Sequence, residues 1–203
     1  MTLFRKSLCL AVLVCAVTAS VALAATIRGT EGPDTIMGTP ARDTINALAG
    51  DDTVWGLRGD DIINAGDGND TVNGDGTCGP GAGGSGTYCD SSPTAGVGND
   101  LITGGKGNDI LRGQGGYDGI AGEAGDDTID GGPSSDALSG GDGKDTITGG
   151  SGMDAVSGGG GDDTIYVNDR NPYDVVSCGG GRDTVHRDGG DIIASDCEVV
   201  VGP

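Results

Sequence analysis

The sequence predicts an all-β solenoid, in which very short strands from tandem repeats stack on one another. Three observations predict it: aspartates recur every nine residues, an aliphatic residue stands two positions after each, and glycine supplies 44 of the 203 residues. A nine-residue period with one aliphatic position fits neither an amphipathic helix nor a long strand. It fits a three-residue strand followed by a six-residue turn, and strands this short must pair with copies above and below them.

The repeat runs in two blocks, and its phase does not change inside either block. The aspartates stand at Asp34, Asp43, Asp52, Asp61 and Asp70, and then at Asp100, Asp109, Asp118, Asp127, Asp136, Asp145, Asp154 and Asp163. A glycine precedes each of them by two positions, except where Ala41 and Ser134 stand. Glycine allows the positive φ values that tight turns demand. In each strand we expect the aliphatic residue to point inward and its two neighbours to point outward.

The composition excludes an ordinary globular core and several classes of partner. Aromatic residues make up only 3% of the chain, so few large side chains can fill an interior. Its net charge is −20 with 11 basic residues, which leaves no basic patch for nucleic acid. Of the 31 acidic residues 28 are aspartates, whose short side chains suit tight turns and rigid sets of oxygen ligands.

The first 24 residues predict a cleaved secretory signal. Arg5 and Lys6 form the positive end, Leu8 to Val17 is an unbroken apolar run, and Ala22-Leu23-Ala24 is an A-x-A cleavage site. The alternative is an uncleaved membrane anchor, because weakly apolar residues continue to Ala25. Cleavage would remove two positive charges, changing the net charge from −20 to −22, and would leave no membrane span.

Four cysteines remain after the predicted cleavage, at Cys78, Cys89, Cys178 and Cys197. An even number in an exported chain predicts two disulfides. Sequence proximity favours Cys78–Cys89 and Cys178–Cys197 among the three possible pairings. A zinc site is disfavoured, because the chain has no C-x₂-C pair.

The cleanest units, Gly104–Arg112 (GGKGNDILR) and Gly140–Thr148 (GGDGKDTIT), carry a family resemblance. They resemble the G-G-x-G-x-D-x-U-x pattern of the hemolysin-type, or RTX, calcium-binding repeat. The resemblance extends over about residues 29–194. It implies a right-handed parallel β-roll with two nonapeptides per turn, in which several Ca²⁺ ions lie between turn loops that are neighbours in the stack.

The resemblance also implies which residues bind the ions. The thirteen repeat aspartates and Asp183 would be ligands, and backbone carbonyls of the glycine-rich turns would complete each site. Repeats two apart would share ions. The implied pairs are Asp109 with Asp127, Asp127 with Asp145, Asp145 with Asp163, Asp100 with Asp118, Asp118 with Asp136, and Asp136 with Asp154.

Breaks in the period divide the chain after the signal into four parts. We expect an N-terminal repeat block at 25–73, a Gly/Ser-rich insertion at 74–94, a central block at 95–166, and irregular repeats with a disulfide-stapled cap at 167–203. The insertion is predicted to be a disulfide-closed surface loop, with a small binding excrescence as the alternative. Val167–Tyr173 lacks turn glycines, so no calcium site is expected there.

The sequence offers no catalytic constellation. His186 is the only histidine, so neither a zincin motif nor a Ser-His-Asp set can be assembled, and it is predicted to be an exposed bystander. Paired carboxylates occupy the same slot in their repeats, so ligation or turn formation explains them. These pairs are Asp51-Asp52, Asp60-Asp61, Asp126-Asp127 and Asp162-Asp163.

The predicted function is a secreted, extracellular or cell-surface, non-catalytic calcium-binding protein that folds when it binds Ca²⁺. The alternative is an adhesin-like or ice-binding structural protein that uses one flat face of the roll. A column of outward threonines at Thr128, Thr146 and Thr164 suggests such a face, although threonine is also a good strand residue. Trp55 and Tyr166 are also predicted to project outward, and a protein or carbohydrate partner is not identified.

Overall fold

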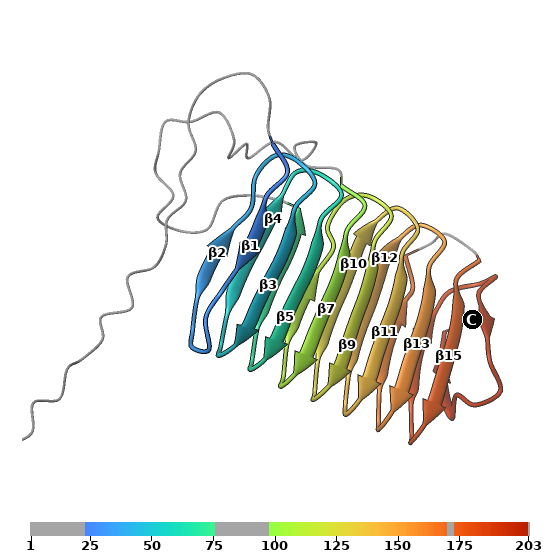
Figure 1. Ribbon diagram of the computed structural model, residues 1–203. Helices are drawn as coiled ribbons and strands as arrows, with labels where there is room; N and C mark the ends of the chain where they lie inside the picture. The colour runs from blue at the N-terminus through green and yellow to red at the C-terminus, as the bar shows by residue number, and fades with distance from the viewer. Residues whose placement is uncertain (1–22, 76–97, 170–172, 203) are drawn as a thin grey trace, which may run out of the picture.

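The computed structural model describes residues 23–75, 98–169 and 173–202. In these ranges the chain forms a roll of two parallel β-sheets that face each other, and each turn of chain adds one strand to each sheet (Figure 1). The predicted all-β parallel roll is therefore confirmed. No helix in the described ranges is long and apolar enough to cross a bilayer.

Each sheet has nine strands, and consecutive strands of the chain alternate between the sheets. The first sheet contains, in spatial order, β1 (Thr26–Arg28), β3 (Thr44–Ala49), β5 (Ile62–Asp67), β7 (Leu101–Lys106), β9 (Gly119–Ala124), β11 (Ala137–Asp142), β13 (Ala155–Gly160), β15 (Val175–Gly180) and β17 (Ile192–Ile193). The second contains β2 (Thr35–Met37), β4 (Thr53–Leu57), β6 (Thr71–Asp75), β8 (Ile110–Arg112), β10 (Thr128–Pro133), β12 (Thr146–Ser151), β14 (Thr164–Val167), β16 (Thr184–Arg187) and β18 (Val199–Val201).

The register confirms two nonapeptides per turn. In the regular part of the roll paired residues are 18 apart, as in Ile129 opposite Ile147. The stack continues across residues 76–97, because β5 pairs with β7 and β6 pairs with β8. Ile63 lies opposite Ile102 there, in the same inward column.

The core is a single column of aliphatic side chains from both sheets. The predicted residues are all buried: Ile36, Ile45, Val54, Ile63, Val72, Ile102, Leu111, Ile120, Ile129, Leu138, Ile147, Val156 and Ile165. Burying each of them removes apolar surface from water, which contributes about 1.5–3 kcal/mol per side chain. A second inward position follows two residues later, and in most repeats it holds glycine or alanine, such as Ala47 and Ala65.

Many strands are longer than the three residues predicted. β10 and β12, for example, each have six residues, and Pro133 still lies opposite Ser151. The extra pairs include glycines in the left-handed region, such as Gly132 at φ +109°. Because glycine has no side chain, these positions show no alternation of apolar and polar residues, and the hydrophobic pattern cannot reveal that they continue the strand.

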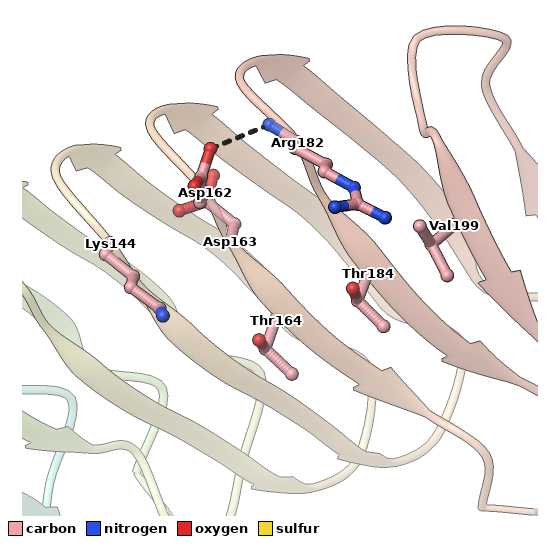
Figure 2. Close-up of a pocket in the computed structure, with 7 residues that line it drawn as sticks. All are labelled: Lys144, Asp162, Asp163, Thr164, Arg182, Thr184 and Val199. Carbon is pink, nitrogen blue, oxygen red and sulfur yellow. Dashed lines mark hydrogen bonds between the residues drawn. The ribbon is translucent and has the colours of Figure 1, made fainter.

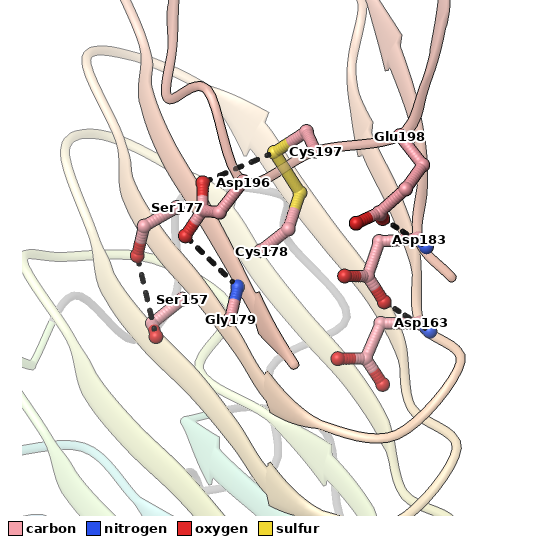
Figure 3. Close-up of a disulfide and its surroundings, with 9 residues drawn as sticks. All are labelled: Ser157, Asp163, Ser177, Cys178, Gly179, Asp183, Asp196, Cys197 and Glu198. Carbon is pink, nitrogen blue, oxygen red and sulfur yellow. Dashed lines mark hydrogen bonds between the residues drawn. A yellow bond between two sulfur atoms is a disulfide. The ribbon is translucent and has the colours of Figure 1, made fainter. Parts of the chain in front are cut away.

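The C-terminal end of the roll is closed by a disulfide (Figure 3). Cys178 is fully buried in β15, in the inward column that glycine occupies in most repeats, and its sulfur is bonded to that of Cys197. Their Cα atoms lie 5.1 Å apart. This is one of the two predicted disulfides, and the other, Cys78–Cys89, falls outside the described residues.

Candidate metal centre along the two edges of the roll

Each repeat aspartate lies in the turn before a strand, and its carboxylate joins neighbouring turns. Asp127 Oδ1 accepts the backbone N–H of Asp109, and Asp145 Oδ1 accepts that of Asp127, both at 2.8 Å. Repetition of this contact produces one row of carboxylates along each edge of the roll, which we call the aspartate ladders. One ladder contains Asp43, Asp61, Asp100, Asp118, Asp136, Asp154, Asp174 and Asp191. The other contains Asp34, Asp52, Asp70, Asp109, Asp127, Asp145, Asp163, Asp183 and Glu198.

The structure brings together every aspartate pair named from the sequence, and it extends both ladders further. Asp174 lies in register although its turn lacks glycines, because Asp154 and Asp174 are hydrogen bonded across 20 residues rather than 18. Glu198 Oε2 accepts the backbone N–H of Asp183 at 2.9 Å and so takes the place of a ladder aspartate (Figure 3). Asp174 and Asp191 were not among the predicted ligands because the spacing changes in this region, and Glu198 was not because it is not an aspartate.

The second carboxylate oxygen of most ladder residues is buried without a hydrogen-bond partner. These are the Oδ2 atoms of Asp52, Asp61, Asp70, Asp100, Asp109, Asp118, Asp127, Asp136, Asp145, Asp154, Asp163, Asp174 and Asp183. A buried, unpartnered oxygen that carries negative charge is costly, and proteins offset that cost with a partner or a cation. The regular rows of such atoms therefore indicate cation binding.

Asp34 and Asp43, in the first two turns, differ from the rest. Asp34 Oδ2 accepts the backbone N–H and the hydroxyl of Thr30. Asp43 Oδ2 accepts the backbone N–H of Thr39, whose hydroxyl donates to Oδ1. The Oδ2 atom of each carboxylate therefore has a partner, which distinguishes Asp34 and Asp43 from the thirteen aspartates with an unpartnered Oδ2.

Most of the unpartnered oxygens lie beside a glycine, and most of these also lie near a carbonyl of the next turn. A Cβ placed on Gly140 would be 2.2 Å from Asp145 Oδ2 and 2.5 Å from the carbonyl oxygen of Gly158. The glycine thus leaves room in which carboxylate and carbonyl oxygens converge. These are the hard oxygen ligands that Ca²⁺ accepts in flexible numbers.

The donor set favours calcium over transition metals. No group of three or more His, Cys, Asp or Glu side chains within the described ranges is arranged to hold a metal ion. A site on the ladders must therefore combine few carboxylates with backbone carbonyls. Zinc is usually held by four nitrogen or sulfur ligands, whereas Ca²⁺ commonly takes six to eight oxygens that include carbonyls.

Burial raises the pKa of many ladder carboxyls, Asp100 and Asp127 among them. The pKa of Asp100 rises to about 8, chiefly by burial, and repulsion from Asp75, Asp61 and Asp118 adds to it. For Asp127 the same causes raise the pKa to about 7, with Asp109 and Asp145 as the nearest like charges. In both residues the backbone hydrogen bond lowers the pKa, but by less than burial raises it. Without a cation, the folded roll therefore binds protons on carboxyls that would otherwise be ionised.

These shifts predict that acid folds the calcium-free protein. Unfolded aspartate titrates near pH 3.9, whereas ladder aspartates in the folded roll titrate at about 6 for Asp52 and Asp163 and about 8 for Asp100. Because the folded pKa values are raised, their contribution to stability is complete below about pH 4 and is lost as the pH rises through about 6 to 8. In calcium-depleted buffer we expect far-UV circular dichroism to show a gain of β-structure between pH 8 and about pH 5. Sedimentation must show a monomer, and an unchanged spectrum would contradict the prediction.

One buried carboxylate, Asp75, lies outside the repeat pattern. It ends β6, its Oδ2 accepts the backbone N–H of Gly98 at 3.0 Å, and its Oδ1 is buried without a partner. Its pKa is raised to about 7, mainly by burial, with repulsion from Asp118 and Asp60 adding to the shift. It has no place in the nonapeptide pattern, so that pattern could not predict it.

The first aspartate of each carboxylate pair links neighbouring turns of the stack. Asp162 Oδ1 accepts the backbone N–H of Arg182 at 2.9 Å, beside a surface hollow lined by Lys144, Asp163, Thr164, Thr184 and Val199 (Figure 2). The equivalent contacts are those of Asp51 with Asn69, Asp60 with Asn99, and Asp126 with Lys144. Contacts between stacked turns thus explain the first member of each pair, while the second belongs to a ladder.

The outer face of the second sheet carries the predicted threonine column. Thr128, Thr146 and Thr164 lie opposite one another, and Thr184 extends the column. Tyr166 is 36% exposed, and the His186 ring stacks on it with centroids 4.7 Å apart. His186 is therefore half of a stacked aromatic pair rather than an isolated side chain.

Comparison with known proteins agrees with this geometry. The family model described as the RTX calcium-binding nonapeptide repeat matches residues 28–63, 48–76, 94–120, 118–147 and 130–165. Together these ranges cover more than half of the chain, including both regular blocks. A search of the curated proteins finds no match.

Proposed function

The chain belongs to the RTX calcium-binding nonapeptide repeat family, and from this we propose that it is a secreted, non-catalytic protein that folds when it binds Ca²⁺. One observation carries the proposal: buried carboxylate oxygens without partners lie in rows, inside the turns that match the family. A row of buried, ionised carboxylates is stable at neutral pH only if a positive charge offsets their repulsion and their loss of hydration. Bound Ca²⁺ supplies that charge.

The proposed ligands are the ladder aspartates whose Oδ2 atoms are buried and unpartnered. Each of them holds its Oδ1 against a backbone N–H, which fixes the carboxylate in one orientation, as Asp127 does with Asp109. The neighbouring glycine, Gly122 in that turn, leaves space beside Oδ2. The roll thereby places the carboxylate and keeps water away from it. Asp34 and Asp43 have other partners and are proposed as turn-forming residues.

Folding on binding follows from the cost of the metal-free state. Like charges stack along each edge at neutral pH, and the 44 glycines raise the conformational entropy that folding removes. Extracellular calcium modules bind with dissociation constants of about 10⁻⁴–10⁻³ M, so the chain would fold only after it leaves a calcium-poor cytoplasm. Metal binding energy would then contribute directly to folding.

Calcium titration by calorimetry tests this function. We expect the protein to bind several Ca²⁺ ions, with a measured heat that includes the heat of folding, because the calcium-free chain becomes ordered as it binds the metal. Mg²⁺, which demands stricter octahedral geometry, is the control and should bind far more weakly. The absence of binding heat up to about 10 mM Ca²⁺ would contradict the proposal, because this concentration is about ten times the largest dissociation constant of such modules.

Secretion and the lack of catalysis rest on the sequence together with the site. The first 24 residues have the form of a secretory signal, which suits two disulfides and folding by extracellular calcium. The one histidine in the sequence, His186, has its ring against Tyr166. The ladder aspartates are held by backbone contacts in repeated turns, which supports a structural rather than a catalytic role.

The threonine column supports a second function less well. Thr35, Thr53 and Thr71 begin a column that Ile110 interrupts and that resumes from Thr128 to Thr184. The next outward column of the same strands, however, holds Trp55, Arg112, Asp130 and Tyr166, among others. A surface so uneven and charged does not suit ice. A thermal-hysteresis assay on the calcium-loaded protein would separate the two functions.

A further inference from the structure

The N-terminal end of the roll offers a role for the new chain end that signal cleavage would create. We propose that the α-ammonium formed on Ala25 binds the carboxylate of Asp43 and closes the first ladder with a positive charge. The proposal rests on the secretion proposed above, since only cleavage between Ala24 and Ala25 places an ammonium there.

Ala25 occupies the position of a ladder residue. Its backbone nitrogen donates to Asp43 Oδ1 at 2.6 Å, just as the nitrogen of Asp43 donates to Asp61 Oδ1 at 2.8 Å. Both contacts join residues 18 apart, which is one turn of the roll. β1 follows immediately, with Thr26 opposite Thr44. Ala25 is thus in register with the roll.

The bond before Ala25 is also where the chain leaves the roll. Leu23 is 80% exposed, and Ala24 is exposed as well. Ala25 is half-buried, and its carbonyl accepts the backbone N–H of Thr44 at 2.9 Å. The bond that the A-x-A motif marks for cleavage therefore coincides with the boundary between exposed chain and ordered roll.

The charge of Asp43 favours an ammonium at this position. Asp43 is fully buried, and its other described donors are the N–H and hydroxyl of Thr39, which are neutral. Asp61, the next carboxylate of the ladder, lies close enough for the two charges to repel. Cleavage would replace one neutral donor by a cation at hydrogen-bond distance, and hydrogen bonds between charged groups are about twice as strong as neutral ones. The ladder would then end on an ion pair.

The test uses the full chain, exported from a host through its own signal. Intact mass should show Ala25 as the first residue. A second chain carries one serine inserted between Ala24 and Ala25, so that processing leaves Ser-Ala25. Ala25 then has its neutral N–H back, and the ammonium moves by one residue, about 3.8 Å. With saturating Ca²⁺, urea denaturation should show an unfolding equilibrium constant about three- to tenfold larger for the insertion chain.

Two substitutions identify the partner of the ammonium. In Asp43→Asn the carboxylate is lost, so the insertion should no longer change the unfolding equilibrium constant. Asp34→Asn, the matched control on the other ladder, should leave the full effect of the insertion. Three results would overturn the proposal: equal stability of the natural chain and the insertion chain, a destabilisation by the insertion that persists in Asp43→Asn, or a first residue other than Ala25 in the natural chain. Calorimetry on the same samples reports calcium binding by the other turns, so a failure of the proposed function is seen separately.

Discussion

Replacing Asp127 by asparagine is expected to weaken Ca²⁺ binding at least about tenfold at two sites of one ladder. Asparagine keeps an oxygen that can accept the backbone N–H of Asp109, so the turn hydrogen bond is preserved while the charge is removed. Two sites are affected because Asp127 lies between Asp109 and Asp145 in the ladder. Tenfold is a lower bound, because even residues that only support metal ligands change affinity by about 10–100-fold.

Asp130→Asn provides the matched control for this substitution. Asp130 lies in β10, three residues beyond Asp127, and its side chain is exposed on the outer face. Asp130→Asn removes the same charge three residues away, so long-range electrostatics change about equally. Calorimetric titration of the two variants should show the loss only in Asp127→Asn. An equal loss in both would mean that net charge, rather than the ladder, determines calcium binding.

Gly161→Ala is expected to lower the free energy of unfolding of the calcium-loaded protein by about 2–6 kcal/mol. Gly161 has φ +135°, a region that residues with a side chain rarely adopt, and such strain costs about 1–3 kcal/mol. The added Cβ would also lie 1.8 Å from the carbonyl oxygen of Gly143 in the neighbouring turn. Backbone must move to relieve that overlap, which adds about 1–3 kcal/mol.

The preceding residue gives the control, since Gly160→Ala adds the same methyl group. The nearest atom to its Cβ would be Asp142 Oδ1 at 3.5 Å, and its φ does not lie in the left-handed region. We expect the free energy of unfolding to change by less than about 1 kcal/mol, with a gain possible because alanine loses less entropy than glycine. Urea denaturation at fixed Ca²⁺ measures both. Similar losses in the two variants would contradict the close stacking of turns at Gly161.

The nine-residue period predicted the architecture because it fixes both the inward residues and the partners of each strand. Ile129 and Ile147 were separated by two repeats in the sequence and lie opposite each other in the structure. Strand length was not predictable, because the second half of each strand is glycine-rich and carries no alternating pattern. Repeats were expected past Tyr166, but their exact register was not predictable, for a different reason. There the sequence spacing changes to 20 residues between Asp154 and Asp174, while the stacking of the turns does not change.

The candidate site was predictable to the extent that it repeats. Ladder membership of residues such as Asp109 and Asp127 followed from their slot, and the hydrogen bonds between them confirm it. Asp43 Oδ2 has a hydrogen-bond partner because Thr39 lies four residues earlier in the chain. At the equivalent position, many later turns have a residue with positive φ. Asp75 depends on Gly98, which is distant in sequence, so only the folded chain reveals that contact.

Far-UV circular dichroism of the exported protein at pH 8, with and without Ca²⁺, tests the central claim most directly. At that pH the ladder carboxyls are largely ionised even with their raised pKa values, which reach about 8 in Asp100. We expect the calcium-free protein to be largely unfolded, and we expect β-structure to appear on addition of Ca²⁺ at millimolar concentration. A strong β-sheet spectrum that survives exhaustive chelation would contradict calcium-dependent folding. The protein would then be a solenoid held by its hydrogen bonds and the Cys178–Cys197 disulfide.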